Sequence, residues 1–224
     1  ALPAGPNGTP SFTPTAPPTA TGTYGDVVIQ AGAQITTPVS ADGNGGRVAL
    51  FGANVTNEGS ILTPAGQTIL AAGLQIGLTA HDSSDPSLRG LDVFVGQVGT
   101  YGGSSSNSGL ISAPRGAITM AGKNVSTTGA LSSTTSVSLN GRIELLAHYG
   151  AQSNPSTANS VGSLPFLNRS SGSVTIGEGS AIEILPEYGS TETTIGTTLA
   201  LRSQINLEGL TVHLAENSTI LAPN

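Results

Sequence analysis

The chain has 224 residues, a net charge of -6, no Cys or Trp, and only seven Lys and Arg. The missing cysteines exclude a disulfide scaffold, a thiolate metal site and a thiol nucleophile. Because no basic cluster is visible, we expect no nucleic-acid partner. No apolar run approaches the roughly 20 residues that cross a bilayer, so we expect no membrane span. Apolar residues make up 37% of the chain but aromatic residues only 4%, which favours a narrow aliphatic core.

The first 23 residues are rich in Pro and show no alternating pattern. Segments of this composition form linkers or extended arms. We therefore predict an arm or linker over 1–23 and a single domain over 24–224. The chain begins without Met or a signal peptide, so we expect it to be a processed or excised piece of a larger protein.

Two stretches that recur at related spacings predict a repeat fold. Gly59–Gly66 returns as Gly109–Gly116, an offset of 50 residues, and Gly46–Val55 returns as Gly116–Val125, an offset of 70. The two offsets differ by one unit of 20 residues. Repeats of this length indicate a solenoid or another repeat array, and the whole chain would then form about seven to nine coils.

Within each repeat, apolar residues alternate with polar ones, as in Val48 and Leu50 or Ile118 and Met120. This alternation places the apolar side chains on one face of a strand, and the intervening Gly and Asn supply corners. No segment has the periodicity of an amphipathic helix. We therefore predict an all-β fold, a right-handed parallel β-helix with coils of about 20 residues.

A third repeat lies in the C-terminal part, where Val174–Ile182 returns as Val212–Ile220 at an offset of 38 residues. We interpret this offset as two coils. The open ends of such a stack expose strand edges that need a cap or neighbouring coils. End-to-end continuation with further β-helix coils is therefore expected.

Three breaks in the periodicity predict surface insertions, at 79–108, 147–171 and 186–198. Insertions in repeat arrays often bind partners, and the two long ones hold a disproportionate share of the aromatic residues. The candidate contact residues are Phe94, Tyr101, Tyr149, Phe166 and Arg169. The alternative is that the rings cover the wall of the solenoid.

The stretches 45–61 and 63–73 read Gly-Gly-Arg-Val-Ala-Leu-Phe-Gly-Ala-Asn-Val-Thr-Asn-Glu-Gly-Ser-Ile and Thr-Pro-Ala-Gly-Gln-Thr-Ile-Leu-Ala-Ala-Gly. They resemble filamentous-haemagglutinin-like exoproteins, which are large surface proteins of Gram-negative two-partner secretion. The resemblance is strongest over 45–78 and 109–146, weaker over 172–224 and absent from 1–23.

The resemblance implies a right-handed β-helix that is exported through an outer-membrane transporter barrel and is secreted or held at the cell surface. It also implies a stalk or adhesin role, with a host or neighbour-cell surface protein or glycan as partner. The family's Asn-Pro-Asn-Leu and Asn-Pro-Asn-Gly-Ile motifs are missing here. We therefore expect the chain to follow the secretion domain of the family.

Other sequence features point to chemistry more weakly. Parallel β-helices also host polysaccharide lyases and hydrolases, which need acidic residues close together or beside a basic one. The nearest candidates are Glu144 with Arg142, and Glu183 with Glu187. The ordinary alternative is that these side chains lie at exposed strand or corner positions.

Three short motifs complete the search for functional residues. His81, Asp82 and Asp85 are candidates for a metal or acid/base site, although a solvated turn explains them as well. Leu91–Val93 spells the integrin-type tripeptide Leu-Asp-Val, which also arises by chance. Asn54 and Asn124 share one repeat position, which indicates a stacked corner asparagine.

No nucleophile elbow, phosphate loop or zinc-protease motif is present. We therefore predict no enzyme and no cofactor. The expected function is that of a structural stalk or adhesin segment of a large secreted surface protein, with the inserted loops as contact surface. The alternative is a polysaccharide-processing or glycan-binding β-helix.

Overall fold

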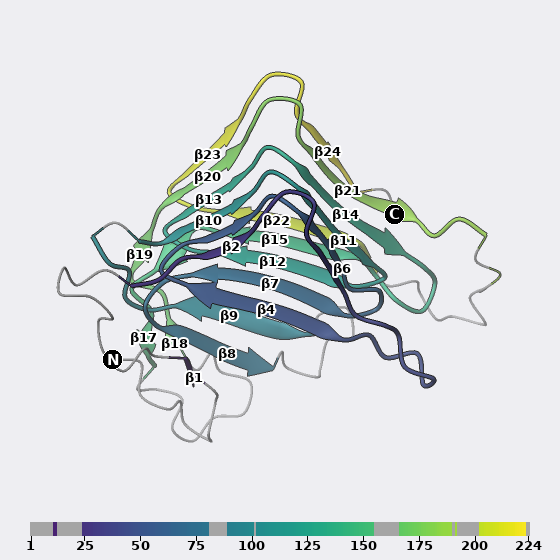
Figure 1. Ribbon diagram of the computed structural model, residues 1–224, viewed down its shortest axis with the longest axis horizontal. Coiled ribbons are helices and arrows are strands. Elements are labelled where there is room, and N and C mark those ends of the chain that lie inside the picture. The colour runs from purple at the N-terminus through teal and green to yellow at the C-terminus, as the bar shows by residue number, and fades with distance from the viewer. Residues whose placement is uncertain are drawn as a thin grey trace.

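The computed structural model describes residues 11–12, 24–80, 89–100, 102–154, 166–189, 191 and 202–222. Within them the chain winds into a three-sided stack of parallel strands, and no described residue is helical. Figure 1 shows the three sheets as the sides of a triangle. The predicted parallel β-helix is therefore confirmed.

Each turn of the stack contributes one strand to each side in the same order. The first sheet is made of β2 (Val27–Ile29), β5 (Val55–Asn57), β10 (Ser104–Asn107), β13 (Asn124–Thr127), β20 (Ser173–Ile176) and β23 (Thr211–Leu214). The second sheet is made of β3 (Gln34–Thr36), β6 (Ser60–Leu62), β11 (Leu110–Pro114), β14 (Ala130–Thr135), β21 (Ala181–Pro186) and β24 (Thr219–Leu221). The third sheet is made of β4 (Arg47–Gly52), β7 (Gln67–Ala72), β12 (Ala117–Ala121), β15 (Arg142–Leu146) and β22 (Gln204–Glu208).

The predicted repeats coincide with the strand register. Ile111 pairs with Ile61, and Val48 and Ile118 both pair with Thr68 of the strand between them. The alternating aliphatic side chains face inward and form one buried cluster along the stack, in which Leu70, Ile118, Met120 and Ile143 have no exposed surface. Burying aliphatic columns in this way is the main stabilising term, at about 25 cal/mol per Å² of apolar surface.

A short polar column interrupts the aliphatic interior at the corner between the first and second sheets. The Nδ2 atom of Asn57 donates to Oδ1 of Asn107 over 2.7 Å, and Nδ2 of Asn107 donates to Oγ1 of Thr127 over 3.2 Å. These three side chains are at most 2% exposed. Asn107 Nδ2 also donates to the carbonyl oxygen of Gly109. The column therefore satisfies its own buried polar groups.

The number of coils differs from the expectation. The 38-residue offset spans one coil and not two, because Val174 pairs directly with Val212 and Ile182 with Ile220. The additional residues lie in the connection between β21 and β22. The described residues thus form six coils, the last with strands in two sheets, in place of about seven to nine.

The first insertion leaves the stack after β7 and returns at β10. It contains an antiparallel hairpin of β8 (Ile76–Ala80) and β9 (Leu91–Val95), to which β1 (Ser11–Phe12) adds a third strand. The predicted bounds of 79–108 were wrong at both ends. At the C-terminal end, Ser104–Asn107 belongs to the third coil, since its small inward side chains fit the interior. At the N-terminal end, the insertion begins earlier than predicted, because it includes the whole of the apolar strand β8.

The second insertion runs between β15 and β20 and contains four two-residue strands. These are β16 (His148–Tyr149), β17 (Gln152–Ser153), β18 (Phe166–Leu167) and β19 (Ser170–Ser171), paired β16 with β19 and β17 with β18. Most of the third predicted insertion, 186–198, lies outside the described residues, as does the predicted arm apart from β1.

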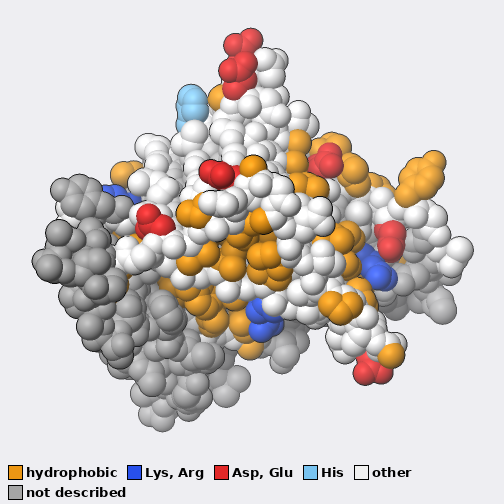
Figure 2. Space-filling view, in the orientation of Figure 1, with side chains coloured by type: hydrophobic (Ala, Val, Ile, Leu, Met, Phe, Trp, Pro, Cys, Tyr) orange, Lys and Arg blue, Asp and Glu red, His pale blue; other side chains and the backbone are white. Residues whose placement is uncertain are grey.

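The aliphatic columns are uncovered at the last coil. In the last coil Val212, Leu214 and Ile220 are 42%, 50% and 37% exposed, whereas Val174, Ile176 and Ile182 in the coil before are fully buried. Figure 2 views the stack from the side of the first coil. Apolar side chains lie in the middle of this face, and charged side chains are few and scattered. No described helix is long and apolar enough to cross a membrane.

Candidate functional site

The outer face of the third sheet is the most elaborated surface of the described residues. The β8–β9 hairpin lies against it (Figure 1), and a second apolar cluster forms between them around Ile69, Ala121, Ile76 and Val95. As a result, all six residues of β7 are buried, although only one face of the strand meets the interior. Covering both faces of a sheet in this way creates a second layer of structure on one wall of the rod.

A third apolar layer lies beyond the hairpin. Phe94 of β9 packs on Phe166 of β18 with a ring centroid distance of 5.3 Å, and Ala151 joins them. Phe94 is 7% exposed and Phe166 is fully buried. The prediction that these two rings offer contact surface was therefore wrong, because the two insertions bury them against each other.

The other three candidate contact residues differ in their exposure and contacts. Tyr149 is half-buried, and the Nζ atom of Lys123 lies 5.9 Å from the centre of its ring. This cation–π contact ties the second insertion to the rod. Arg169 is exposed on the same insertion. Tyr101 lies outside the described residues.

The first predicted acid–base pair is inside this layered region. Glu144 and Arg142 are 4% and 6% exposed, and Nη2 of Arg142 donates to Oε1 of Glu144. Thr119 Oγ1 donates to Oε2 of Glu144 over 3.4 Å. Asp92 of β9 lies 3.9 Å from the same guanidinium group. The arrangement fixes the hairpin to the sheet and keeps Glu144 away from a large substrate.

The second predicted pair is not brought together. Glu183 accepts from Ser132 Oγ over 3.5 Å, whereas Glu187 lies 3.6 Å from Nε of Arg115. Among the described residues no group of three His, Asp or Glu is placed to hold a metal ion. The predicted cluster of His81, Asp82 and Asp85 lies outside the described residues.

Two of the short sequence motifs have structural roles. In the tripeptide Leu91–Val93, Val93 is buried and Asp92 faces Arg142, so the motif is part of the hairpin interface. Asn54 lies at an outer corner, where its Nδ2 donates to Asp26 and its Oδ1 accepts from the backbone N of Ser104. Asn124 holds the equivalent corner and accepts from Ser173 Oγ. The corner asparagines are confirmed, with serines alternating between them.

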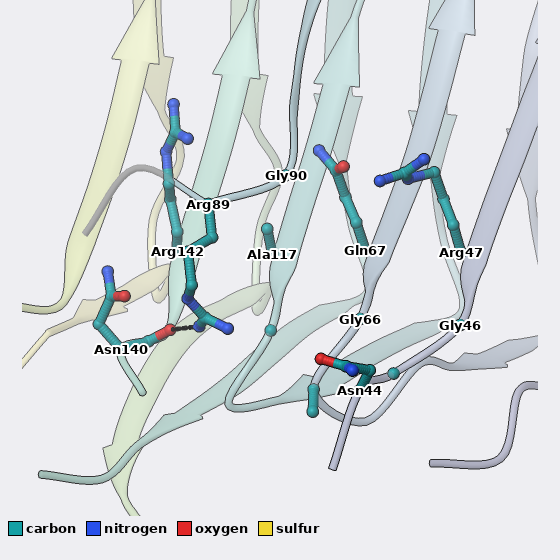
Figure 3. A pocket seen from close by; sticks show the side chains of 13 residues that line it. Asn44, Gly46, Arg47, Gly66, Gln67, Arg89, Gly90, Ala117, Asn140 and Arg142 are labelled. Atoms are coloured by element: carbon teal, nitrogen blue, oxygen red, sulfur yellow. Dashed lines mark hydrogen bonds between the residues drawn. The ribbon is translucent and has the colours of Figure 1, made fainter. Parts of the chain in front are cut away.

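A hollow of about 240 Å³ opens where the strands of the third sheet begin. Its wall includes one row of residues in register across four strands, namely Arg47, Gln67, Ala117 and Arg142. Figure 3 shows this row, with Gly46 and Gly66 at the strand starts and the segment Arg89–Gly90 passing over it. The sequence analysis did not find this hollow, because Arg89 comes from the first insertion.

Arg89 is held at the rim of the hollow by the backbone of two corners. Its Nη2 donates to the carbonyl oxygen of Asn140 over 2.7 Å and to that of Arg115 over 2.9 Å. Burial and the nearby charge of Arg115 lower the pKa of Arg89. Gln67 secures the passing segment, since it exchanges two hydrogen bonds of 2.9 Å with the backbone of Leu91.

These features define the chain as a parallel β-helix with one decorated wall. No protein-family model matches it, and no curated protein matches it. Among solved structures it is similar to the HMW1 secretion domain from Haemophilus influenzae, with a TM-score of 0.52 and 20% sequence identity. The likeness covers 96% of this chain and 54% of that structure, so this chain spans about half of its length. At this identity the likeness shows the shared fold.

Proposed function

We propose that the chain is a rod-forming segment of a large secreted exoprotein of the two-partner secretion kind and serves as a stalk or adhesin. The observation that carries the proposal is the fold likeness to a secretion domain over nearly the whole chain. The resemblance of 45–78 and 109–146 to filamentous-haemagglutinin-like exoproteins supports it independently. The position of the chain after the secretion domain stays a prediction, since the likeness is to a secretion domain itself.

Export through an outer-membrane transporter barrel, and a place outside the Gram-negative outer membrane, are part of this proposal. A cysteine-free chain with a net charge of -6 is compatible with that route. Folding by stacking one coil on the next also suits a chain that emerges gradually, because each coil contacts only its neighbours.

The exposed end of the last coil favours a rod that continues. Its uncovered columns hold Val212, Leu214 and Ile220 in register with the buried columns of the previous coil. A further β-helix coil would bury these side chains and pair the edges of β23 and β24. We propose such a coil as the occupant of this end.

We also propose that the chain is not an enzyme. Glu144 is covered by the hairpin and neutralised by Arg142, and Glu183 and Glu187 each contact a different partner. A glycosidase or lyase site needs acidic groups that converge on an open groove. The described acidic side chains that the sequence suggested do not have that arrangement.

The proposed export of the protein to the cell exterior is tested with an epitope inserted between Asp42 and Gly43 of the full-length protein in its own host. These residues lie in an exposed turn, and a Cβ atom on Gly43 would meet nothing within 4 Å. Antibody should label intact cells or the culture medium, and deletion of the transporter gene should abolish this signal. Labelling only after permeabilisation would refute export.

The adhesive role is tested separately with beads coated with the purified chain. Exchanging the exposed Arg169 on the second insertion for Ala should lower bead attachment to host cells severalfold if this loop is a contact surface. Arg202→Ala, at an exposed arginine outside that insertion, is the matched control. If the unchanged chain, Arg169→Ala and Arg202→Ala attach equally well, Arg169 has no role in contact with the host cell.

A further inference from the structure

The hollow at the start of the third sheet exists because one residue of a row is small. Arg47, Gln67, Ala117, Arg142 and Gln204 occupy the same register position on five successive strands. Four of them have long side chains, whereas Ala117 ends at its Cβ atom. The gap above Ala117 is therefore flanked by Gln67 and Arg142 and is roofed by Arg89 and Gly90 (Figure 3).

The roof carries a positive charge that has no acidic partner among the described residues. Arg89 has its two hydrogen bonds to backbone carbonyl oxygens, and no described carboxylate forms an ion pair with it. Its Nε atom is buried without a hydrogen-bond partner. A half-buried guanidinium group in this state is favourable only if an anion or ordered water completes its hydrogen bonds.

The walls add to the positive potential. Arg47, on the first strand of the row, is exposed and forms no ion pair among the described residues. The side-chain amides of Asn44 and Asn140 are at the edge, and none of the residues lining the hollow is acidic. The nearby carboxylates of Glu144 and Asp92 both lie against Arg142 and offset its charge, so the positive charge left at the hollow is that of Arg89 and Arg47.

The shape sets an upper limit on the ligand. A hollow of about 240 Å³ with glycines at Gly46, Gly66 and Gly90 has room for one small ring or one oxyanion. Gly90 is required where the segment crosses, because its φ is +96° and a Cβ atom would lie 2.8 Å from Gln67 Oε1. Close approach of backbone and amides is typical of sites for small polar ligands.

We propose that this hollow is an oxyanion site that receives the carboxylate or sulfate group of an acidic sugar through Arg89, with the exposed Arg47 adding positive charge at the wall. Planar guanidinium groups bind such groups by paired hydrogen bonds. Bound anion charge would also offset the burial of Arg89. The site deepens the proposed adhesin role, but its test requires only the purified chain and does not depend on export or adhesion.

The experiment is a titration of the ¹⁵N-labelled chain followed by amide chemical shifts at constant ionic strength. Sodium glucuronate, sodium sulfate and glucose are the probes, and the amides of Gly46, Gly66 and Gly90 are the reporters. Saturable shifts with glucuronate but not with glucose are expected. Saturation with sulfate as well would identify the oxyanion as the recognised group, whereas glucuronate alone would show that the sugar ring is needed. The absence of saturation with both anions would overturn the proposal.

Three variants separate binding from folding. Glutamine already occupies this register position on two other strands, as Gln67 and Gln204. Ala117→Gln should therefore keep the fold, fill the hollow and abolish the shifts. Arg47→Gln should weaken binding roughly two- to fivefold, as expected for an exposed charge. Lys123→Gln removes an exposed positive charge at the corner between the third and first sheets and should leave the affinity unchanged. Wild-type affinity in a folded Ala117→Gln chain would place the anion outside the hollow and refute the assignment.

Discussion

The buried polar column at the first corner makes Asn107 the most informative single site in the rod. Replacing it with Ala removes the 2.7 Å bond from Asn57 and the bonds to Thr127 and Gly109. Each net hydrogen bond contributes about 1 kcal/mol, and a buried amide left without its partner costs about 1–3 kcal/mol more. Because Nδ2 of Asn57 keeps longer bonds to the carbonyl oxygens of Gly59 and Leu110, we expect a loss in the free energy of unfolding below the sum of these terms, about 2–4 kcal/mol.

Asn124→Ala is the matched control, because this asparagine lies one coil further on but at the outer side of a corner. It is exposed, and its Oδ1 atom accepts a 3.0 Å bond from Ser173 Oγ. Its loss should cost at most about 0.5–1 kcal/mol. Urea denaturation followed by far-ultraviolet circular dichroism measures both variants, with the m values compared to verify a common transition. If Asn107→Ala costs no more than Asn124→Ala, the column does not stabilise the interior as argued.

Three further predictions follow from the packing. Gly109→Ala should cost more than about 2 kcal/mol, because its Cβ atom would lie 2.0 Å from a carbonyl oxygen of the coil before; Gly25→Ala, where a Cβ atom meets nothing within 4 Å, should leave the melting temperature unchanged. Phe166→Ala should cost about 3–5 kcal/mol locally, seen as faster protease cleavage within 147–172 while the amides of the stack keep their exchange protection. Glu144→Ala should lower the free energy of unfolding by about 3–5 kcal/mol, because it leaves the buried guanidinium group of Arg142 without its nearest counter-charge. An unchanged melting temperature would show that the Arg142–Glu144 pair is not important for docking the hairpin.

Much of the rod could be predicted from the sequence because stacking imposes a strict register. The pairing of Ile111 with Ile61, and of Val212 with Val174, follows directly from the repeats in the sequence. The same reasoning misjudged the 38-residue offset. A long connection between two strands adds residues without adding a coil, and an offset alone does not distinguish the two.

The layered wall was harder to predict, although a signal was present. β7 ends in Ile-Leu-Ala-Ala, four consecutive apolar residues, and an unbroken apolar run is typical of a strand buried on both faces. The buried pair Asn57 and Asn107 also stands at the 50-residue offset of the repeat. The hollow at Ala117 had no such signal, because it depends on where the first insertion carries Arg89.

Both long insertions leave the rod at the same corner, after strands of the third sheet and before strands of the first. On either side the backbone of consecutive coils stays in register, as the pairing of β5 with β10 and of β13 with β20 shows. The corner therefore behaves as a splice point at which segments of different length can be exchanged while the scaffold is left intact. Variation of a surface protein can accumulate there at little cost to folding, and foreign peptides grafted at this corner should be displayed on one side of the rod.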